Sequence, residues 1–329
     1  MPEIFNALPG EEVPVGGISR ALARMWAGGE EPAPGKPNTG DSAKATQVNF
    51  VLHLGYFTTA EDATRQFQTA VEFSRRYPCR VVVLCPMRKE EGGQEFRAKI
   101  YGECTPGKTK GDMRCCEFVM LSYPIASRRY LENQVSVCLS ADIPLYYWAH
   151  NFSSSVRLND YQYLLSRSKR VLFDSALAPA GMAESVWPKP EMVRDLAYAR
   201  LLPVRQAIGQ FLSGFAPAAI IGGLAGVTVQ HGTAHVAEAR GLASWVGARL
   251  NDCGAPAELP VEVTPAAALS AHDIELSFRY TNGQHFSWRG DTAKGCAHLK
   301  ASIGGANSEL AIAFNLMGPA AALAEAMFF

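Results

Sequence analysis

The fold of this 329-residue chain is decided by the stretch Val81-Val82-Val83-Leu84-Cys85. This continuous, β-branched apolar run is typical of a strand that is buried on both faces of a sheet. It follows a predicted helix over Thr59–Arg76, which has Thr59 as its N-cap and an acidic first turn. A predicted strand over 46–54 precedes that helix. Strand, helix and buried strand form a βαβ unit, which implies a right-handed crossover and an α/β layer architecture.

The same alternation continues along the first half of the chain. Strands are predicted over 96–101, 116–121, 144–148 and, last, 170–174, and helices over 127–139 and 160–166. Residues 1–44 are predicted to be a short amphipathic helix, Ile18–Trp26, followed by a mobile linker rich in Gly and Pro. We therefore expect an α/β domain, a layered sheet with βαβ units, over 45–180.

The sequence pattern changes after residues 181–190, a stretch that contains one Gly and two Pro residues. A long helix over Glu191–Leu212, interrupted at Pro203, and a second over Ala234–Leu250 are predicted. Alternating strands at 274–280 and 285–289 flank an Asn-Gly turn, which is the strongest short hairpin signal. Residues 190–329 are therefore expected to form an α+β domain with antiparallel strands.

Composition narrows the function classes. Hydrophobic residues make up 48% of the chain, and 31 basic residues balance 31 acidic ones, so no basic excess points to nucleic acid. The apolar segment 211–229 approaches the length of a membrane span, but its Gly, Pro and Ser content favours a helix end and a buried strand. Eight scattered cysteines and an N-terminus without a secretory pattern predict reduced thiols, a cytoplasmic location and no membrane partner.

One string satisfies a nucleotide-binding pattern. Residues Gly102–Thr109 match the phosphate loop G-x-x-x-x-G-K-[ST], in which Gly107, Lys108 and Thr109 would contact phosphates and Mg²⁺. That chemistry needs a buried strand before the loop and a helix after it. A half-exposed strand precedes it and another strand follows, so we interpret the segment as an exposed hairpin-like loop. A nucleotide-binding enzyme or sensor stays the alternative function.

Two further patterns point only weakly to a site. His231 and His235 have a metal-ligand spacing, but Gly232 places His231 before the helix, so no metal site is predicted. Cys115 and Cys116 are adjacent and would point to opposite faces of a strand, which leaves one buried. They are candidates for redox regulation, and a thiol-regulated adaptor is a third possible function.

Three segments combine arginine, aromatic and proline residues. The first has Pro144 four residues before Trp148, the second is an R-x-x-x-D-S segment, and the third is an arginine- and proline-containing helix. The residues of the second and third segments are Arg170, Asp174 and Ser175, then Arg200, Pro203 and Arg205. In this order the segments resemble the glucose-6-phosphate dehydrogenase assembly protein family, OpcA, although Ala149 and His150 replace the Trp and Pro that follow Trp148 in that family.

The resemblance implies a non-catalytic protein that binds glucose-6-phosphate dehydrogenase and favours its active oligomer, at the entry to the oxidative pentose phosphate pathway. Such activation is a population shift, because a protein that binds one state of an enzyme stabilises that state. No cofactor is expected. The candidate partner- or ligand-binding residues are Trp148, His150, Arg170, Asp174, Ser175, Arg200 and Arg205. Arg170 with Asp174, and Arg200 with another carboxylate, could equally form structural ion pairs that hold the domains together.

Overall fold

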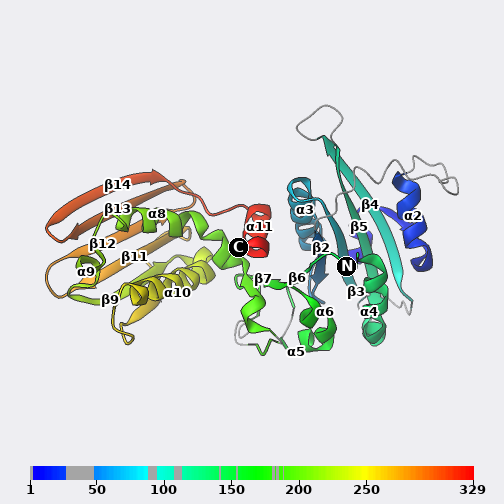
Figure 1. The fold of residues 1–329 in the computed structure, drawn as a ribbon, viewed down its shortest axis with the longest axis horizontal. Coiled ribbons are helices and arrows are strands. Elements are labelled where there is room, and N and C mark those ends of the chain that lie inside the picture. The colour runs from blue at the N-terminus through cyan, green and yellow to red at the C-terminus, as the bar shows by residue number, and fades with distance from the viewer. Residues whose placement is uncertain are drawn as a thin grey trace. The chain divides into compact units, whose positions relative to one another are not determined.

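A computed structural model describes residues 3–26, 48–87, 95–106, 113–140, 142–152, 155–179, 182, 185–187 and 189–329. Contacts divide the chain into two compact units (Figure 1). The first consists of Met1–Asp195 together with Leu323–Phe329, and the second of Leu196–Ala322. Each unit has its own sheet, and each is described separately.

The first unit contains an eight-stranded sheet in the order β1-β4-β5-β3-β2-β6-β7-β8. Six neighbours, from β5 to β8, run parallel, whereas β4 is antiparallel to β5 and β1 is antiparallel to β4. The strands are β1 (Glu11–Val13), β2 (Val48–Leu54), β3 (Cys79–Met87), β4 (Arg97–Pro106), β5 (Met113–Pro124), β6 (Leu145–His150), β7 (Arg170–Phe173) and β8 (Val193–Asp195).

Helices cover both faces of this sheet, which confirms the predicted α/β class. On one face, α3 packs Phe67 against Phe118 and Phe73 against Phe50. On the other face, the core around Val51 includes side chains from α2, α4 and α6. The helices of this unit are α1 (Ile4–Ala7), α2 (Ile18–Trp26), α3 (Ala60–Arg76), α4 (Leu131–Cys138), α5 (Ser155–Leu158) and α6 (Gln162–Arg167).

The strand at 170–173 is not the last of the sheet. Val193–Asp195 forms β8, which pairs in parallel with β7, so the predicted helix over 191–212 is wrong at its start. The helix begins as α7 (Leu196–Arg200) and continues as α8 (Leu202–Leu212), with Pro203 in the first turn of α8. A three-residue strand is too short to show an alternating pattern, and Pro is well tolerated at a helix start.

The first unit is completed by a helix that the sequence did not predict. In α11 (Pro319–Phe328), the side chains of Leu323 and Met327 are fully buried. The ring of Phe328 lies 4.8 Å from that of Tyr77 and 5.8 Å from that of Tyr146. This late segment therefore packs against α3 and β6.

The second unit has a six-stranded sheet in the order β10-β9-β11-β12-β13-β14. Only β10 and β9 are parallel, which agrees with the predicted α+β class. Side chains from α8 and α10 share one core with the inward-facing residues of the sheet, Trp288 among them. The elements are α9 (Pro217–Ile221), β9 (Leu224–His231), α10 (Val236–Asp252), β10 (Val261–Pro265), β11 (Asp273–Tyr280), β12 (His285–Asp291), β13 (Cys296–Ile303) and β14 (Ala306–Ala313).

The predicted hairpin is present, with Gly283 at φ +79° in the turn between β11 and β12. The segment 211–229 forms the end of α8, the short α9 and the start of β9. Within the described part of the chain, none of the helices has the length and apolar character that a membrane span requires.

Candidate functional site

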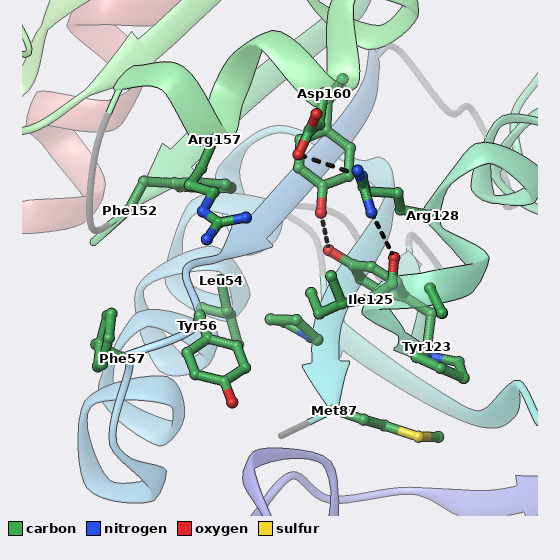
Figure 2. A pocket seen from close by; sticks show the side chains of 14 residues that line it. Leu54, Tyr56, Phe57, Met87, Tyr123, Ile125, Arg128, Phe152, Arg157 and Asp160 are labelled. Carbon is green, nitrogen blue, oxygen red and sulfur yellow. Dashed lines mark hydrogen bonds and ion pairs between the residues drawn. The ribbon is translucent and has the colours of Figure 1, made fainter. Parts of the chain in front are cut away.

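A cavity of about 670 Å³ opens at the carboxyl edge of the first sheet (Figure 2). Its walls come from the ends of β2, β3 and β5, from the segment after β6, and from the short helices that follow β5 and β6. We call it the carboxyl-edge cavity. Its lining residues are Leu54, Tyr56, Phe57, Pro86, Met87, Tyr123, Pro124, Ile125, Ala126, Arg128, Phe152, Arg157, Asp160 and Tyr161.

The strand order explains why a cavity forms there. From β2, the chain moves outward through β3 to β5, then returns to β6 on the other side of β2 and moves outward again. The order of parallel strands therefore reverses between β2 and β6. In open α/β sheets, ligands bind outside the carboxyl ends of the strands at this switch point, because the connections there diverge to opposite faces.

A chain of hydrogen bonds runs from the buried core to the cavity wall. The two ring nitrogens of His53 each lie 2.7 Å from a tyrosine hydroxyl, Nδ1 from Tyr147 and Nε2 from Tyr123. The hydroxyl of Tyr123 lies 2.7 Å from that of Tyr161. His53, Tyr147 and Tyr123 are fully buried, and Tyr123 also lines the cavity together with Tyr161. The chain thus joins β6, β2 and β5 to the segment after α5.

The protonation of this chain follows from its burial. Burial lowers the pKa of His53 to about 3, so the imidazole is neutral and offers one donor and one acceptor. Four groups then hold four protons for three hydrogen bonds. A free hydroxyl proton would be costly on fully buried Tyr147, so Tyr147 donates to His53, His53 to Tyr123, and Tyr123 to Tyr161. The hydroxyl proton of Tyr161 is left for the cavity.

Two arginines give the cavity a positive character. Arg128 pairs with Asp160 at 3.2 Å, and its guanidinium also donates to the carbonyl oxygen of Ile125 at 3.1 Å. Arg157 projects from α5 into the cavity (Figure 2) and has no ion-pair partner among the described residues. Of the charged side chains that line the described cavity, two are positive and one is negative.

The start of α3 is acidic, with Glu61 and Asp62 in its first turn, although it adjoins the switch point. The Asp62 carboxylate accepts a 2.7 Å hydrogen bond from Nε2 of His150 and one from Gln66. Burial opposes ionisation, but these hydrogen bonds prevail and lower the pKa of Asp62. Gly55 directly follows β2 at the same switch point. The backbone after β6 approaches it so closely that a Cβ at this position would lie 1.9 Å from the carbonyl oxygen of Asn151.

The candidate residues of the first unit have intramolecular partners. Trp148 and His150 are buried, and Trp148 stacks on Phe50. The carboxylate of Asp174, also buried, caps the following turn by accepting from the amide of Ala176. The hydroxyl of Ser175 donates to Asp195 at 2.6 Å.

The three candidate arginines are all partly exposed. Arg170 donates to the carbonyl oxygen of Ala326 at 3.0 Å and so holds α11. Arg200 pairs with the buried carboxylate of Glu238 at 2.7 Å. The guanidinium of Arg205 lies 4.1 Å from the ring centre of Tyr198. These contacts are structural, and a role in partner binding remains a prediction.

The prediction that every cysteine is reduced is wrong for two of them. Cys104 and Cys115 form a disulfide, because the antiparallel register of β4 and β5 places them directly opposite each other. Cys116 points the other way and is buried, as expected, and burial raises the pKa of its thiol. Cys116 is therefore a less reactive candidate for redox regulation than the sequence alone indicated.

The described part of the phosphate-loop pattern lies in β4. Gly102 to Pro106 form the end of β4, which pairs antiparallel with β5, so both flanking elements are strands, as interpreted from the sequence. Gly107, Lys108 and Thr109 lie outside the described residues.

No cluster of three potential metal ligands occurs among the described residues. His231 lies at the end of β9, before the helix, as the sequence indicated. Nε2 of His235 instead lies 2.8 Å from the hydroxyl of Thr292.

Sequence reasoning missed the residues that build the cavity, notably His53, Tyr123, Arg128, Arg157 and Tyr161. One signal was available: His53, like Asn49, is a polar residue in a strand of apolar neighbours, and such a residue needs buried partners. The partners are 70 and 94 positions away in the sequence, so only the strand order reveals them.

The strand order and the switch-point cavity define the first unit as a doubly wound α/β domain. Comparison with known proteins identifies a family that this unit resembles. Residues 70–186 match the family model described as glucose-6-phosphate dehydrogenase subunit N-terminal domain. This match covers the strands from β3 to β7 and confirms the resemblance to the glucose-6-phosphate dehydrogenase assembly protein family.

A curated relative is similar over a longer part of the chain. It is named putative OxPP cycle protein OpcA, from Synechocystis sp., and is 23% identical over 207 residues. The aligned part makes up 59% of this chain and 43% of the relative. The chain therefore spans less than half of the length of the curated relative that it matches.

Proposed function

We propose that this protein is a non-catalytic assembly and activation factor that binds glucose-6-phosphate dehydrogenase and favours its active oligomer. Its place would be the oxidative pentose phosphate pathway. The family match over residues 70–186 carries the proposal, because the description of that family names glucose-6-phosphate dehydrogenase. The name of the Synechocystis relative supports the same pathway.

Four of the predicted contact residues retain surface for a partner. Arg170, Ser175, Arg200 and Arg205 are partly exposed, whereas Trp148, His150 and Asp174 are buried and would act by shaping the surface around them. Arg205 is an informative member of the four, because its guanidinium packs over the ring of Tyr198 and stays partly exposed. Arginine is also enriched among residues that dominate interface energetics.

The test is to mix the purified chain with the glucose-6-phosphate dehydrogenase of the same organism. We expect higher dehydrogenase activity and a shift to a larger oligomer on gel filtration, both saturating with added protein. Unchanged activity together with an unchanged elution volume would contradict the proposal. The chain alone, assayed with glucose 6-phosphate and NADP, serves as the control for intrinsic activity.

A second measurement separates partner contact from folding. Arg205→Gln should weaken activation about tenfold, as expected for a charged interface residue, while the melting temperature stays near that of the wild type. The matched control is Arg249→Gln on α10, where the side chain is 61% exposed and pairs with Asp252 one turn away. Equal activation by both variants would show that Arg205 is not part of the interface.

A further inference from the structure

We infer that the carboxyl-edge cavity is a binding site for a small organic anion, an apolar or aromatic body that carries a phosphate or carboxylate group. This inference is independent of the proposed function, because it concerns only the first unit of this chain. The observations that carry it are the size of the cavity, its two arginines, and the outward donor at the end of the buried hydrogen-bond chain.

The size of the cavity requires more than a simple ion. Sites for small organic molecules occupy roughly 300–1,000 Å³, and this open cavity has a volume of about 670 Å³. Inorganic phosphate would leave most of that volume unfilled. The apolar and aromatic surfaces of Leu54, Tyr56, Phe57 and Phe152 therefore select a ligand with an organic body.

The phenyl ring of Phe57 supports this reading. It is 62% exposed, and its centre lies 5.3 Å from that of Tyr56 in an edge-to-face arrangement. Because both Tyr56 and Phe57 line the cavity, their rings extend the apolar surface that a ligand can contact. Both aromatic rings belong to the connection between β2 and α3, at the switch point.

The charge of the cavity selects an anion. Arg128 is already oriented by Asp160 and by the carbonyl oxygen of Ile125. Arg157 lacks such a partner among the residues that the structure describes, so its guanidinium can pair with a ligand. A planar guanidinium binds phosphate or carboxylate with two parallel hydrogen bonds.

The third polar contact comes from the cavity wall. The hydroxyl proton of Tyr161 has no acceptor within the chain of hydrogen bonds that starts at Tyr147, so it is available to an oxygen of the ligand. The chain fixes the orientation of that donor, because each buried hydroxyl is oriented by the group behind it. The anionic group therefore lies on the side of Arg128, Arg157 and Tyr161, away from the acidic start of α3.

Four probes test the inference, because they separate the contribution of the apolar ring from that of the anionic group. These are 1-naphthyl phosphate, 1-naphthoate, 1-naphthol and inorganic phosphate, each titrated into the full chain by calorimetry and by naphthyl fluorescence. We expect saturable binding of the phosphate or the carboxylate, and at least tenfold weaker binding of 1-naphthol and of inorganic phosphate. The tighter of the two naphthyl anions identifies the preferred anionic group.

Binding measurements on variants of the lining residues test whether the probe binds in the cavity. Arg157→Gln should weaken binding of the tighter anion about tenfold, as expected when a charge-assisted hydrogen bond is lost. Tyr161→Phe should weaken it severalfold. The matched control is Arg129→Gln, since Arg129 lies beside Arg128 in sequence but packs over the ring of Tyr130.

Three results would overturn the inference. They are the absence of saturable binding of both naphthyl anions at millimolar concentration, equal affinity for 1-naphthol, and unchanged affinity of the Arg157→Gln variant. Thermal unfolding of each variant is measured alongside, so that a loss of binding with an unchanged melting temperature is attributed to the site. Because no dehydrogenase is present, failure here leaves the assembly proposal intact.

Discussion

His53 shows at the scale of one residue how burial determines chemistry. Its ring is enclosed by Phe152 and Tyr161, whose ring centres lie 4.9 and 4.5 Å away, and both of its nitrogens are hydrogen-bonded to tyrosines. A buried imidazole in such surroundings is a fixed neutral hydrogen-bonding element. It supports the cavity wall and does not act as an acid or base near neutral pH.

This neutrality predicts a pH dependence of stability. The pKa of His53 is about 3 in the folded state and near 6.5 in the unfolded state, so the unfolded chain binds the proton more tightly between these values. The contribution of neutral His53 to the free energy of unfolding is therefore complete above pH 6.5 and is lost as the pH is lowered. The contribution of His53 amounts to about 1.4 kcal/mol per pH unit between pH 6 and 4.5.

Urea unfolding at a series of pH values measures this slope. His53→Gln keeps one donor and one acceptor but cannot titrate, so its stability should fall less steeply than that of the wild type over the same range. NMR of the wild type gives a second measurement that does not depend on the variant. A His53 ring that titrates near pH 6.5 in the folded protein would contradict the prediction.

At the scale of elements, local signals decided which features the sequence could predict. The helices α2 and α3 and the hairpin of β11 and β12 are as expected, because a cap, an amphipathic face and an Asn-Gly turn are properties of neighbouring residues. Three features depend on distant residues and were missed: β8, α11 and the Cys104–Cys115 disulfide. For the same reason, the sequence predicted the arginine- and aromatic-rich segments but not the cavity.

The disulfide between β4 and β5 should add measurably to the free energy of unfolding. It closes a short loop, since the two cysteines are 11 residues apart. Replacing both by serine should lower the free energy of unfolding by about 2–3 kcal/mol, because the unfolded chain regains conformational freedom. Cys253→Ser, at a free and partly exposed thiol, is the matched control. Chemical denaturation without reductant measures the difference, and equal stability of the two variants would contradict it.

At the scale of the whole molecule, the first unit is discontinuous in sequence. Its core takes in residues 323–329 after the chain has formed the second unit. The ring of Phe328 meets those of Phe73, Tyr77 and Tyr146, and Arg170 holds the backbone of Ala326. The last helix is thus a structural part of the first unit.

A single substitution tests this arrangement. Phe328→Ala should destabilise the first unit by about 2 kcal/mol, less than the loss of a fully buried phenylalanine because this ring is only partly buried. Hydrogen exchange resolves the two units separately, and protection should fall in α3 and β6 while β11 to β13 keep theirs. Phe329→Ala, at a residue that is 79% exposed, is the control. Equal loss of protection in both units would contradict the prediction.

The return of residues 323–329 to the first unit also has a consequence for synthesis on the ribosome. The 195 residues of its main part emerge first, but they wait for their final helix while the ribosome adds the whole second unit. At about 5–20 residues per second, this delay is on the order of ten seconds. During that time the aromatic patch that receives Phe328 is uncovered, so a nascent chain of this protein exposes a surface that chaperones can bind.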